Sequence, residues 1–213
     1  AKGDAGLLIN VANACTNLGK YSLAKKYYLR AVRMHPRDMA GWMGLRHLAL
    51  LRGDVEAYMG ATLAVFSRMD AASLAESARV LRGLNQFGKA DAIIHSADEA
   101  GKRGDELDAE RLLAYRRQGI HPERRARIFV KLKSASSMSD EIRACLAEYS
   151  WLERDFPSTV SYVASMTDPS LASLRLLWDS RLRLNECDIL EKELEEYRSG
   201  HDECFDCWYF LAK

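Results

Sequence analysis

Four residues near the C-terminal end of the sequence could bind a metal ion. Cys204 and Cys207 form a Cys-x-x-Cys pair, His201 precedes them, and Cys187 could complete a set of four. Thiolates and imidazoles are the ligands that zinc takes in tetrahedral sites. A second Cys-x-x-Cys pair is missing, and two cysteines on a helix with aromatic neighbours are more often small buried residues. We therefore expect no metal here, with the four-residue set as the alternative, and a disulfide between Cys204 and Cys207 would be strained on a helix.

Catalytic residue types are not gathered into a recognisable motif. The five histidines fall one to a repeat or turn, no Ser or Cys lies in a nucleophile motif, and there is no glycine-rich phosphate loop. We predict that the chain is not an enzyme and that it folds without a cofactor.

The elements that carry these side chains are predicted to be helices. Apolar residues at helical spacing in 8–15 and 24–31 indicate two helices, and Pro36 closes the pair. Part of this spacing recurs 34 residues later, where Gly53 follows Gly19 and Trp42 follows Leu8. A fixed period of this length predicts a solenoid, in which each helix pair buries its apolar face against its neighbours.

The segment GKYSLAKKYYLRAVRMHPRD, residues 19–38, resembles the tetratricopeptide repeat. It has the Gly-x-aromatic turn, the Ala-aromatic-Ala spacing and the closing proline of that family, whereas the second unit has Tyr58 at the place of an alanine. The resemblance is clear in residues 5–104 and degenerate beyond them. We therefore assign three repeats to a first region, 1–104, and degenerate helix pairs to a second region, 105–213. It implies an all-α, right-handed superhelical solenoid of about six antiparallel helix pairs, the second half continuing the first.

In that family, the first helix of each unit lines a concave groove that docks a peptide or a helix of a partner. Placed on this sequence, the resemblance assigns these residues to the groove: Asn10, Asn13, Asn17, His47, Arg79, Arg82, Arg116 and Arg117. A guanidinium offers a planar fork of donors that suits carboxylates. The resemblance therefore implies an acidic protein or peptide partner, and the alternative is that the arginines only solvate the surface.

Two specialised grooves of the family do not fit these residues. The clamp for chaperone C-termini needs Lys, Asn and basic residues where this chain has Ile9, Gly44, Ala72 and Glu76. The asparagine ladder of sugar-transferring members needs an asparagine in every unit, and only Asn10 supplies one. Both specialisations are excluded.

Charge is distributed unevenly, although the formal net charge is only +1. Residues 1–70 carry a net +5, residues 71–133 a net +4 and residues 134–213 a net −8. Such polarity can steer an acidic partner to the N-terminal half or favour head-to-tail association of copies. The acidic C-terminal third argues against a nucleic acid partner. If the chain bound RNA, the arginines from Arg116 to Arg127 would form the basic patch that contacts it.

The sequence also bears on the compartment. No apolar run approaches the roughly 20 residues of a membrane span, and the N-terminus lacks the pattern of a signal peptide. Five cysteines without framework spacing favour a reducing, cytoplasmic compartment, and a periplasmic or envelope location is the alternative. Because the chain begins with Ala1, we expect it to be a segment of a longer protein.

These observations predict a scaffold for protein-protein interaction. The alternative is a regulatory or oligomerising arm of a larger protein, such as a glycosyltransferase, a transcription activator or a secretion or envelope assembly factor. Trp151, Leu152, Trp178 and Trp208 are expected to fill helix interfaces, and an exposed pair of them would instead mark an anchor site.

Overall fold

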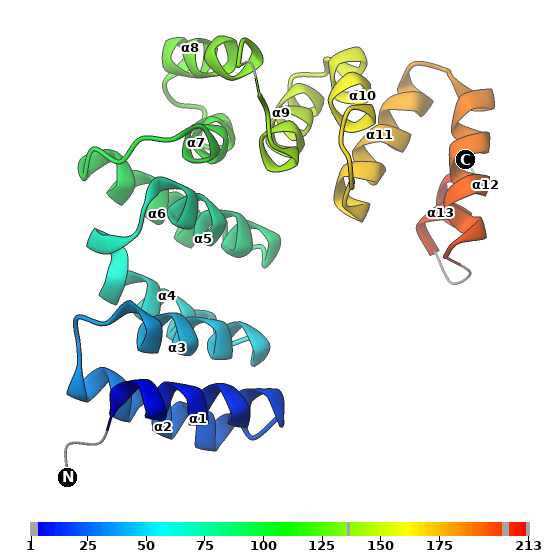
Figure 1. The fold of residues 1–213 in the computed structure, drawn as a ribbon. Helices are drawn as coiled ribbons and strands as arrows, with labels where there is room; N and C mark the ends of the chain where they lie inside the picture. The colour runs from blue at the N-terminus through cyan, green and yellow to red at the C-terminus, as the bar shows by residue number, and fades with distance from the viewer. Residues whose placement is uncertain (1–3, 136, 202–204, 212–213) are drawn as a thin grey trace. The chain divides into compact units, whose positions relative to one another are not determined.

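The computed structural model describes residues 4–135, 137–201 and 205–211, which contain α-helices, one short 3-10 helix and no β-strand. The chain divides into two compact units, Ala1–Lys102 (unit 1) and Arg103–Lys213 (unit 2), which can be followed by colour in Figure 1. None of the helices in the described ranges has the length and hydropathy of a bilayer span.

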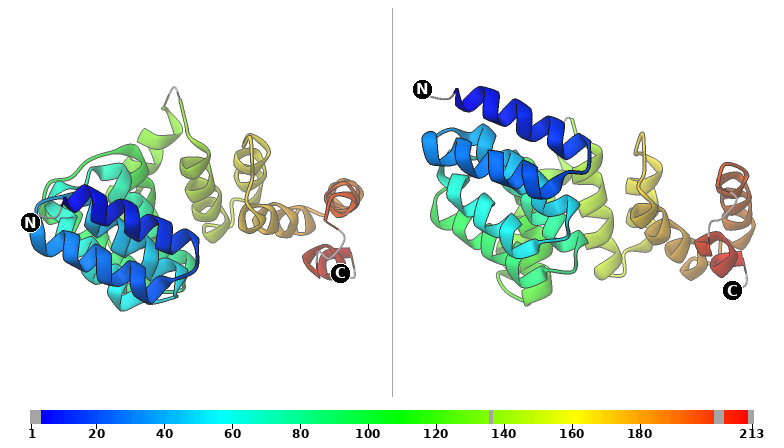
Figure 2. Two further views of the ribbon diagram at one scale, coloured as in Figure 1. Left: turned by 60° about the horizontal axis from the view of Figure 1, so that its bottom comes forward. Right: turned by 90° about the horizontal axis from the view of Figure 1, so that it is seen from below.

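Unit 1 consists of three antiparallel helix pairs. They are α1 (Ala5–Asn17) with α2 (Tyr21–Met34), α3 (Met39–Leu51) with α4 (Val55–Val65), and α5 (Ala71–Gly83) with α6 (Phe87–Glu99), and the 3-10 helix η1 (Phe66–Arg68) follows α4. The partners in each pair pack against each other, and α3 also contacts both α1 and α2. Figure 2 shows α1 and α2 side by side.

Unit 2 repeats this arrangement with less regular sequences. Its pairs are α7 (Asp105–Gln118) with α8 (Pro122–Lys133), α9 (Asp140–Leu152) with α10 (Phe156–Ala164), and α11 (Leu171–Arg183) with α12 (Cys187–Ser199), and α13 (Phe205–Leu211) packs on α12. First helices contact each other along the unit, since α9 touches both α7 and α11. The predicted all-α solenoid of about six helix pairs is confirmed.

A left-handed residue marks the turn inside every pair. These residues are Gly19, Gly53, Asn85, Gly119, Arg154 and Asn185, all with φ between 58° and 69°. Each turn is closed by a backbone hydrogen bond across the end of the first helix, as from Lys20 N to Cys15 O at 2.8 Å and from Glu186 N to Arg181 O at 2.9 Å. This is the Schellman ending of a helix. The left-handed turn conformation thus recurs in every pair, even where the turn residue is not a glycine.

Two prolines of unit 2 lie in the first turn of a helix. Pro122 is the first residue of α8, and Pro157 is in the first turn of α10. Pro169 lies just before a helix. Ser170 is the N-cap of α11 and accepts a hydrogen bond from Ser173 N, so the helix begins after both residues.

Candidate functional site

An apolar cavity of unit 1 is lined by α2, α3 and α4. It has a volume of about 210 Å³. Its lining consists of apolar residues from all three helices and three charged residues at the rim: Leu29, Trp42, Leu45, Leu48, Ala49, Ala57, Gly60 and Ala61, with Lys25, Arg52 and Asp54. The Trp42 indole donates a hydrogen bond to Pro36 O at 3.1 Å, which fixes the ring as one wall. The cavity is large enough for one large apolar side chain.

The second helix pair places its bulky residue differently from the first. In α2, Ala24 lies at the helix interface and Tyr28 fills the space beyond it, with exposures of 0% and 2%. Thirty-four residues later the order is reversed, with Tyr58 buried at the place of Ala24 and Thr62 at the place of Tyr28. Gly60 in the same helix has no atom within 4 Å of where a Cβ would lie. Gly60 lines the cavity together with Ala57 and Ala61, so the side of α4 that faces the cavity carries only small residues.

The rim of the cavity is more basic than acidic. Lys25 is exposed on α2, and Arg52 is exposed at the C-cap of α3. The Asp54 carboxylate accepts a hydrogen bond from Ala57 N at 3.0 Å and is therefore engaged as the N-cap of α4. Lys25 and Arg52 are the charges that remain for a ligand, and they favour carboxylates beside an apolar group.

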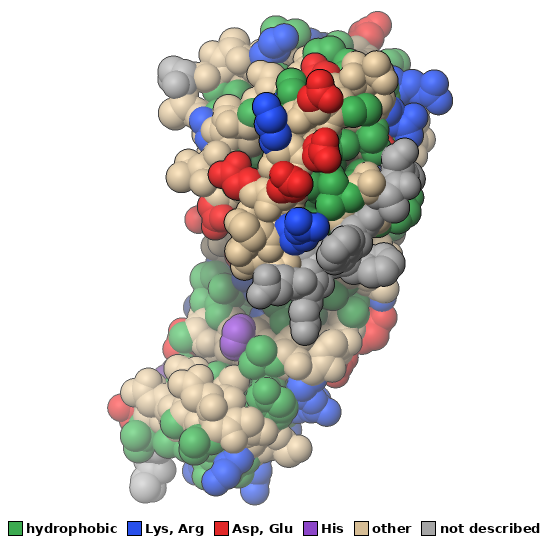
Figure 3. All heavy atoms as spheres, turned by 90° about the vertical axis from the view of Figure 1, so that its right-hand side faces the viewer, with side chains coloured by type: hydrophobic (Ala, Val, Ile, Leu, Met, Phe, Trp, Pro, Cys, Tyr) green, Lys and Arg blue, Asp and Glu red, His purple; other side chains and the backbone are tan. Residues whose placement is uncertain are grey.

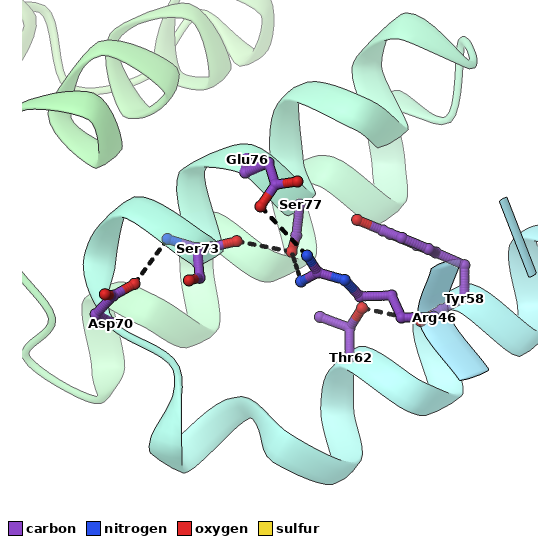
Figure 4. A network of polar contacts seen from close by, with 7 residues as sticks. All are labelled: Arg46, Tyr58, Thr62, Asp70, Ser73, Glu76 and Ser77. Atoms are coloured by element: carbon purple, nitrogen blue, oxygen red, sulfur yellow. Dashed lines mark hydrogen bonds and ion pairs between the residues drawn. The ribbon is translucent and has the colours of Figure 1, made fainter. Parts of the chain in front are cut away.

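The displaced bulk of Tyr58 faces a polar network that joins α3 to α5 (Figure 4). Buried Arg46 donates to Ser77 Oγ at 3.0 Å and to Glu76 Oε2 at 3.2 Å, and its guanidinium lies 5.7 Å from the centroid of the Tyr58 ring. Burial raises the pKa of the Tyr58 hydroxyl, which therefore stays protonated. This network is a structural tie within unit 1 because Arg46 is satisfied by the chain itself.

The asparagines predicted for the groove lie together on α1. Asn10, Asn13 and Asn17 are exposed and separated by three and four residues, so they form one stripe on the helix. The Tyr28 hydroxyl donates to the Asn13 side-chain oxygen, which orients that amide. His47 is exposed on α3, the neighbouring first helix.

The predicted arginines are divided between the two units. Arg79 and Arg82 are half-buried on α5 in unit 1, and Arg116 and Arg117 are half-buried on α7 in unit 2. Arg116 pairs with Glu153 Oε1 at 2.5 Å and donates to Leu152 O at 3.1 Å. That guanidinium therefore holds α7 to the end of α9.

The same carboxylate also limits the basic patch of unit 2. Arg125 lies 3.5 Å from Glu153 Oε1, so this carboxylate is shared by two arginines. Arg124 lies 5.2 Å from the centroid of the Tyr115 ring. These contacts reduce the basic surface that a nucleic acid would meet.

The cysteine set is not brought together in the described residues. Cys207 is fully buried in the core with Trp178 and Leu194, whereas Cys187 is exposed. His201 is exposed and stacks on the Tyr197 ring at a centroid distance of 4.0 Å. Cys204 lies outside the described residues. Within the described ranges, no three His, Cys, Asp or Glu side chains are placed to hold a metal ion.

The tryptophans of unit 2 have different environments. Trp178 is 1% exposed and contacts the Phe210 ring edge-on at a centroid distance of 5.6 Å. Trp151 is half-buried and donates its indole N–H to Asp179 Oδ2 at 2.9 Å. Leu152 packs against the core of α7 and α9, and the side chain of Trp208 lies outside the description. Trp178 is therefore part of the core of unit 2, and Trp151 is held by a hydrogen bond to a neighbouring helix.

Sequence reasoning missed the cavity, because its key residues lie on second helices and not on the groove positions. Lys25, Leu29 and Gly60 have no motif of their own. The signal that could have found the α4 part of the lining is the spacing of three small residues, Ala57, Gly60 and Ala61, on one face of that helix.

Helix pairs closed by a left-handed turn and stacked at a period near 34 residues define the class: the chain has the fold of the tetratricopeptide repeat proteins. Its sequence matches no protein-family model and no curated protein. The likeness is therefore one of structure.

Three solved structures illustrate the likeness. A tetratricopeptide repeat protein from Parabacteroides merdae matches with a TM-score of 0.67 at 14% identity, over 98% of this chain and 83% of its own. PilW, a type IV pilus biogenesis factor, matches with a TM-score of 0.69 at 12% identity. The match covers 97% of this chain and 98% of the PilW chain. A chain of the Cut9-Hcn1 hetero-tetramer of APC/C matches with a TM-score of 0.68 at 13% identity. The match spans 98% of this chain but only 42% of the Cut9-Hcn1 chain, so this chain covers less than half the length of that protein.

Proposed function

We propose that the chain is a scaffold for protein-protein interaction that docks a segment of another protein on unit 1. A large apolar side chain of the segment enters the cavity between α2 and α4, and flanking carboxylates lie near Lys25 and Arg52. The cavity of about 210 Å³ carries this proposal, because its concave lining is mainly apolar and is contributed by three helices of unit 1. The fold supports it only in general terms, since folds host many functions.

The energetics favour an apolar anchor with an acidic flank. Burying one large apolar side chain contributes about 1.5–3 kcal/mol, and such anchors in desolvated pockets dominate binding energies. Exposed ion pairs with Lys25 and Arg52 contribute only about 0.2–1 kcal/mol each. The rim therefore selects and orients the segment, while the cavity holds it.

The stripe of Asn10, Asn13 and Asn17, with His47, is proposed as a second contact surface. An asparagine amide donates and accepts at once, so it can pair with a peptide backbone whatever the side chains are. Arg79, Arg82, Arg116 and Arg117 remain proposed groove residues, and Arg116 also holds α7 to the end of α9 within unit 2. We propose no catalysis, cofactor or metal for this function, and the arm of a larger protein in the cytoplasm or the cell envelope is an equally suitable setting.

The proposal is tested by selecting random peptides displayed on phage against the purified chain. We expect the selected peptides to share one large apolar residue flanked by Asp or Glu. The decisive variant is Gly60→Leu, which fills the cavity from a helical position with nothing within 4 Å of its Cβ. Selected peptides should bind this variant at least about tenfold more weakly, since that factor corresponds to 1.4 kcal/mol and the anchor is worth at least as much.

Gly88→Leu is the matched control. Gly88 is also a helical, exposed glycine of unit 1 with nothing within 4 Å of its Cβ, but it lies on α6 outside the cavity. It should leave peptide binding unchanged. Peptides that bind the Gly60→Leu variant as well as the wild type, or that share no apolar anchor, would refute the docking site.

A further inference from the structure

The exposed face of α2, beside the cavity, is uniformly basic. Its exposed residues include Lys25, Lys26, Arg30 and Arg33, and the helix contains no Asp or Glu. Leu23, which is 40% exposed, lies on the same face. Lys26 and Arg30 are four residues apart, so two like charges face each other along the helix at a cost of a few tenths of a kcal/mol. A face of this kind is most stable when an acidic surface covers it.

The exposed face of α12 has the opposite charge. It carries Asp188, Glu191, Glu195 and Glu196 and a single lysine. Figure 3 shows acidic side chains gathered, with hydrophobic ones among them, over the C-terminal part of the chain. Glu191 and Glu195 are four residues apart and carry like charges, as Lys26 and Arg30 do on α2.

The two faces also match in the position of their apolar groups. Ile189 is 45% exposed on α12 and lies to one side of the acidic stripe of Asp188, Glu191 and Glu195. The cavity lies to one side of the basic face of α2, because Lys25 and Leu29 line it. Placing Ile189 in the cavity thus brings the acidic stripe against the basic face.

We propose that α12 of a second copy of this chain docks on the α2–α4 surface of the first, with Ile189 in the cavity and the acidic stripe against Lys26, Arg30 and Arg33. This inference rests on the proposed function, since it names an occupant for the same cavity. The contact is heterologous, because α2 of one copy meets α12 of the next, so repeated docking gives a ring or an open chain of copies.

The test is sedimentation velocity of the whole chain over a range of protein concentrations in low salt, at about 50 mM NaCl, and high salt, at about 500 mM. We expect the average sedimentation coefficient to rise with protein concentration in low salt. The association should weaken at least about tenfold in high salt, because exposed charge pairs are screened. Ile189→Ser should weaken it in low salt, because the anchor is removed.

Charge reversal identifies the faces. The α2 variant Lys26→Glu/Arg30→Glu and the α12 variant Glu191→Lys/Glu195→Lys should each fail to associate alone, while an equimolar mixture of the two should associate again. This recovery requires that the two faces meet. The control Arg127→Glu/Lys133→Glu changes two exposed residues of α8 and alters net charge as the α2 variant does. It should associate like the wild type, and circular dichroism checks that all variants are helical.

The outcomes separate this inference from the proposed function. A wild-type chain that stays monomeric in low salt, reversed variants that associate as the wild type does, or a mixture that fails to recover would each overturn the docking of α12. If phage selection still yields Gly60-sensitive peptides, the cavity remains a docking site for other proteins. If selection also yields none, the proposed function fails as well.

Discussion

The packing around Gly44 predicts opposite effects for two glycine-to-alanine substitutions in unit 1. Gly44 is in α3, and a Cβ there would lie 2.2, 2.5 and 2.7 Å from three atoms of the Tyr28 ring. Gly60 is in α4, and a Cβ there would meet nothing within 4 Å. We expect Gly44→Ala to destabilise the protein and Gly60→Ala to stabilise it.

The magnitudes follow from two competing terms. Replacing an interior helical glycine by alanine gains about 1 kcal/mol. At Gly44 the ring must retreat by about 1 Å to restore contact, yet Tyr28 is 2% exposed and donates a hydrogen bond to Asn13. Such overpacking costs about 1–3 kcal/mol, and the rigid surroundings place it at the upper end. The net loss for Gly44→Ala is therefore about 2 kcal/mol, against a gain of about 1 kcal/mol for Gly60→Ala.

Thermal unfolding followed by circular dichroism at 222 nm measures both. For a chain of this size 1 kcal/mol shifts Tm by about 2–4 °C, so Gly44→Ala should lower Tm by about 4–8 °C and Gly60→Ala should raise it by about 2–4 °C. The two variants share the same chemical change, so any difference between them reports their surroundings. Equal shifts of the same sign would show that helix propensity outweighs contact with Tyr28, and the packing argument would be wrong.

Two further predictions concern unit 2. Hydrogen bonds from the Thr167 backbone N–H and from Arg143 hold the pKa of Asp140 below its ordinary value. The ionised Asp140 carboxylate therefore stabilises the fold above about pH 4, and this stabilisation is lost as pH falls through the folded-state pKa. In urea unfolding, Asp140→Asn should lose less stability than the wild type between neutral pH and about pH 3. Arg154 has a φ of 63°, a conformation that costs a non-glycine residue about 1 kcal/mol, so Arg154→Gly should raise Tm while Arg154→Ala should not; a lower Tm for the glycine variant would contradict this account.

The fold could be predicted from the sequence because the turn residues and the apolar period carry the same information. Gly19 and Gly53 gave the period directly, and both have the left-handed φ that glycine permits. Arg154 and Asn185 occupy the equivalent places in unit 2 without a glycine, so their turns could be located only through the apolar spacing of the flanking helices. The later units therefore look degenerate in sequence while their backbone is regular.

The candidate site was less predictable because exposure and pairing are tertiary properties. The sequence assigned Arg116 to a groove by position, but its nearest carboxylate, Glu153, comes from the next pair and cannot be recognised from local spacing. Similarly, Arg46 on α3 was not singled out, although it is buried and its hydrogen bond to Ser77 links two repeats. Arg46 and Arg116 are thus both engaged by the chain itself, which their positions in the sequence did not reveal.

The cavity has a sequence signature that follows from helix geometry. Residues three and four positions apart share one face of a helix. Ala57, Gly60 and Ala61 are spaced in this way on α4, and all three line the cavity. Tyr58 and Thr62 are also four residues apart, so they share a different face, and neither lines the cavity. Three small residues on one face of a second helix therefore indicate this cavity better than the exchange of a small and a large residue does, and none of them is at a predicted groove position.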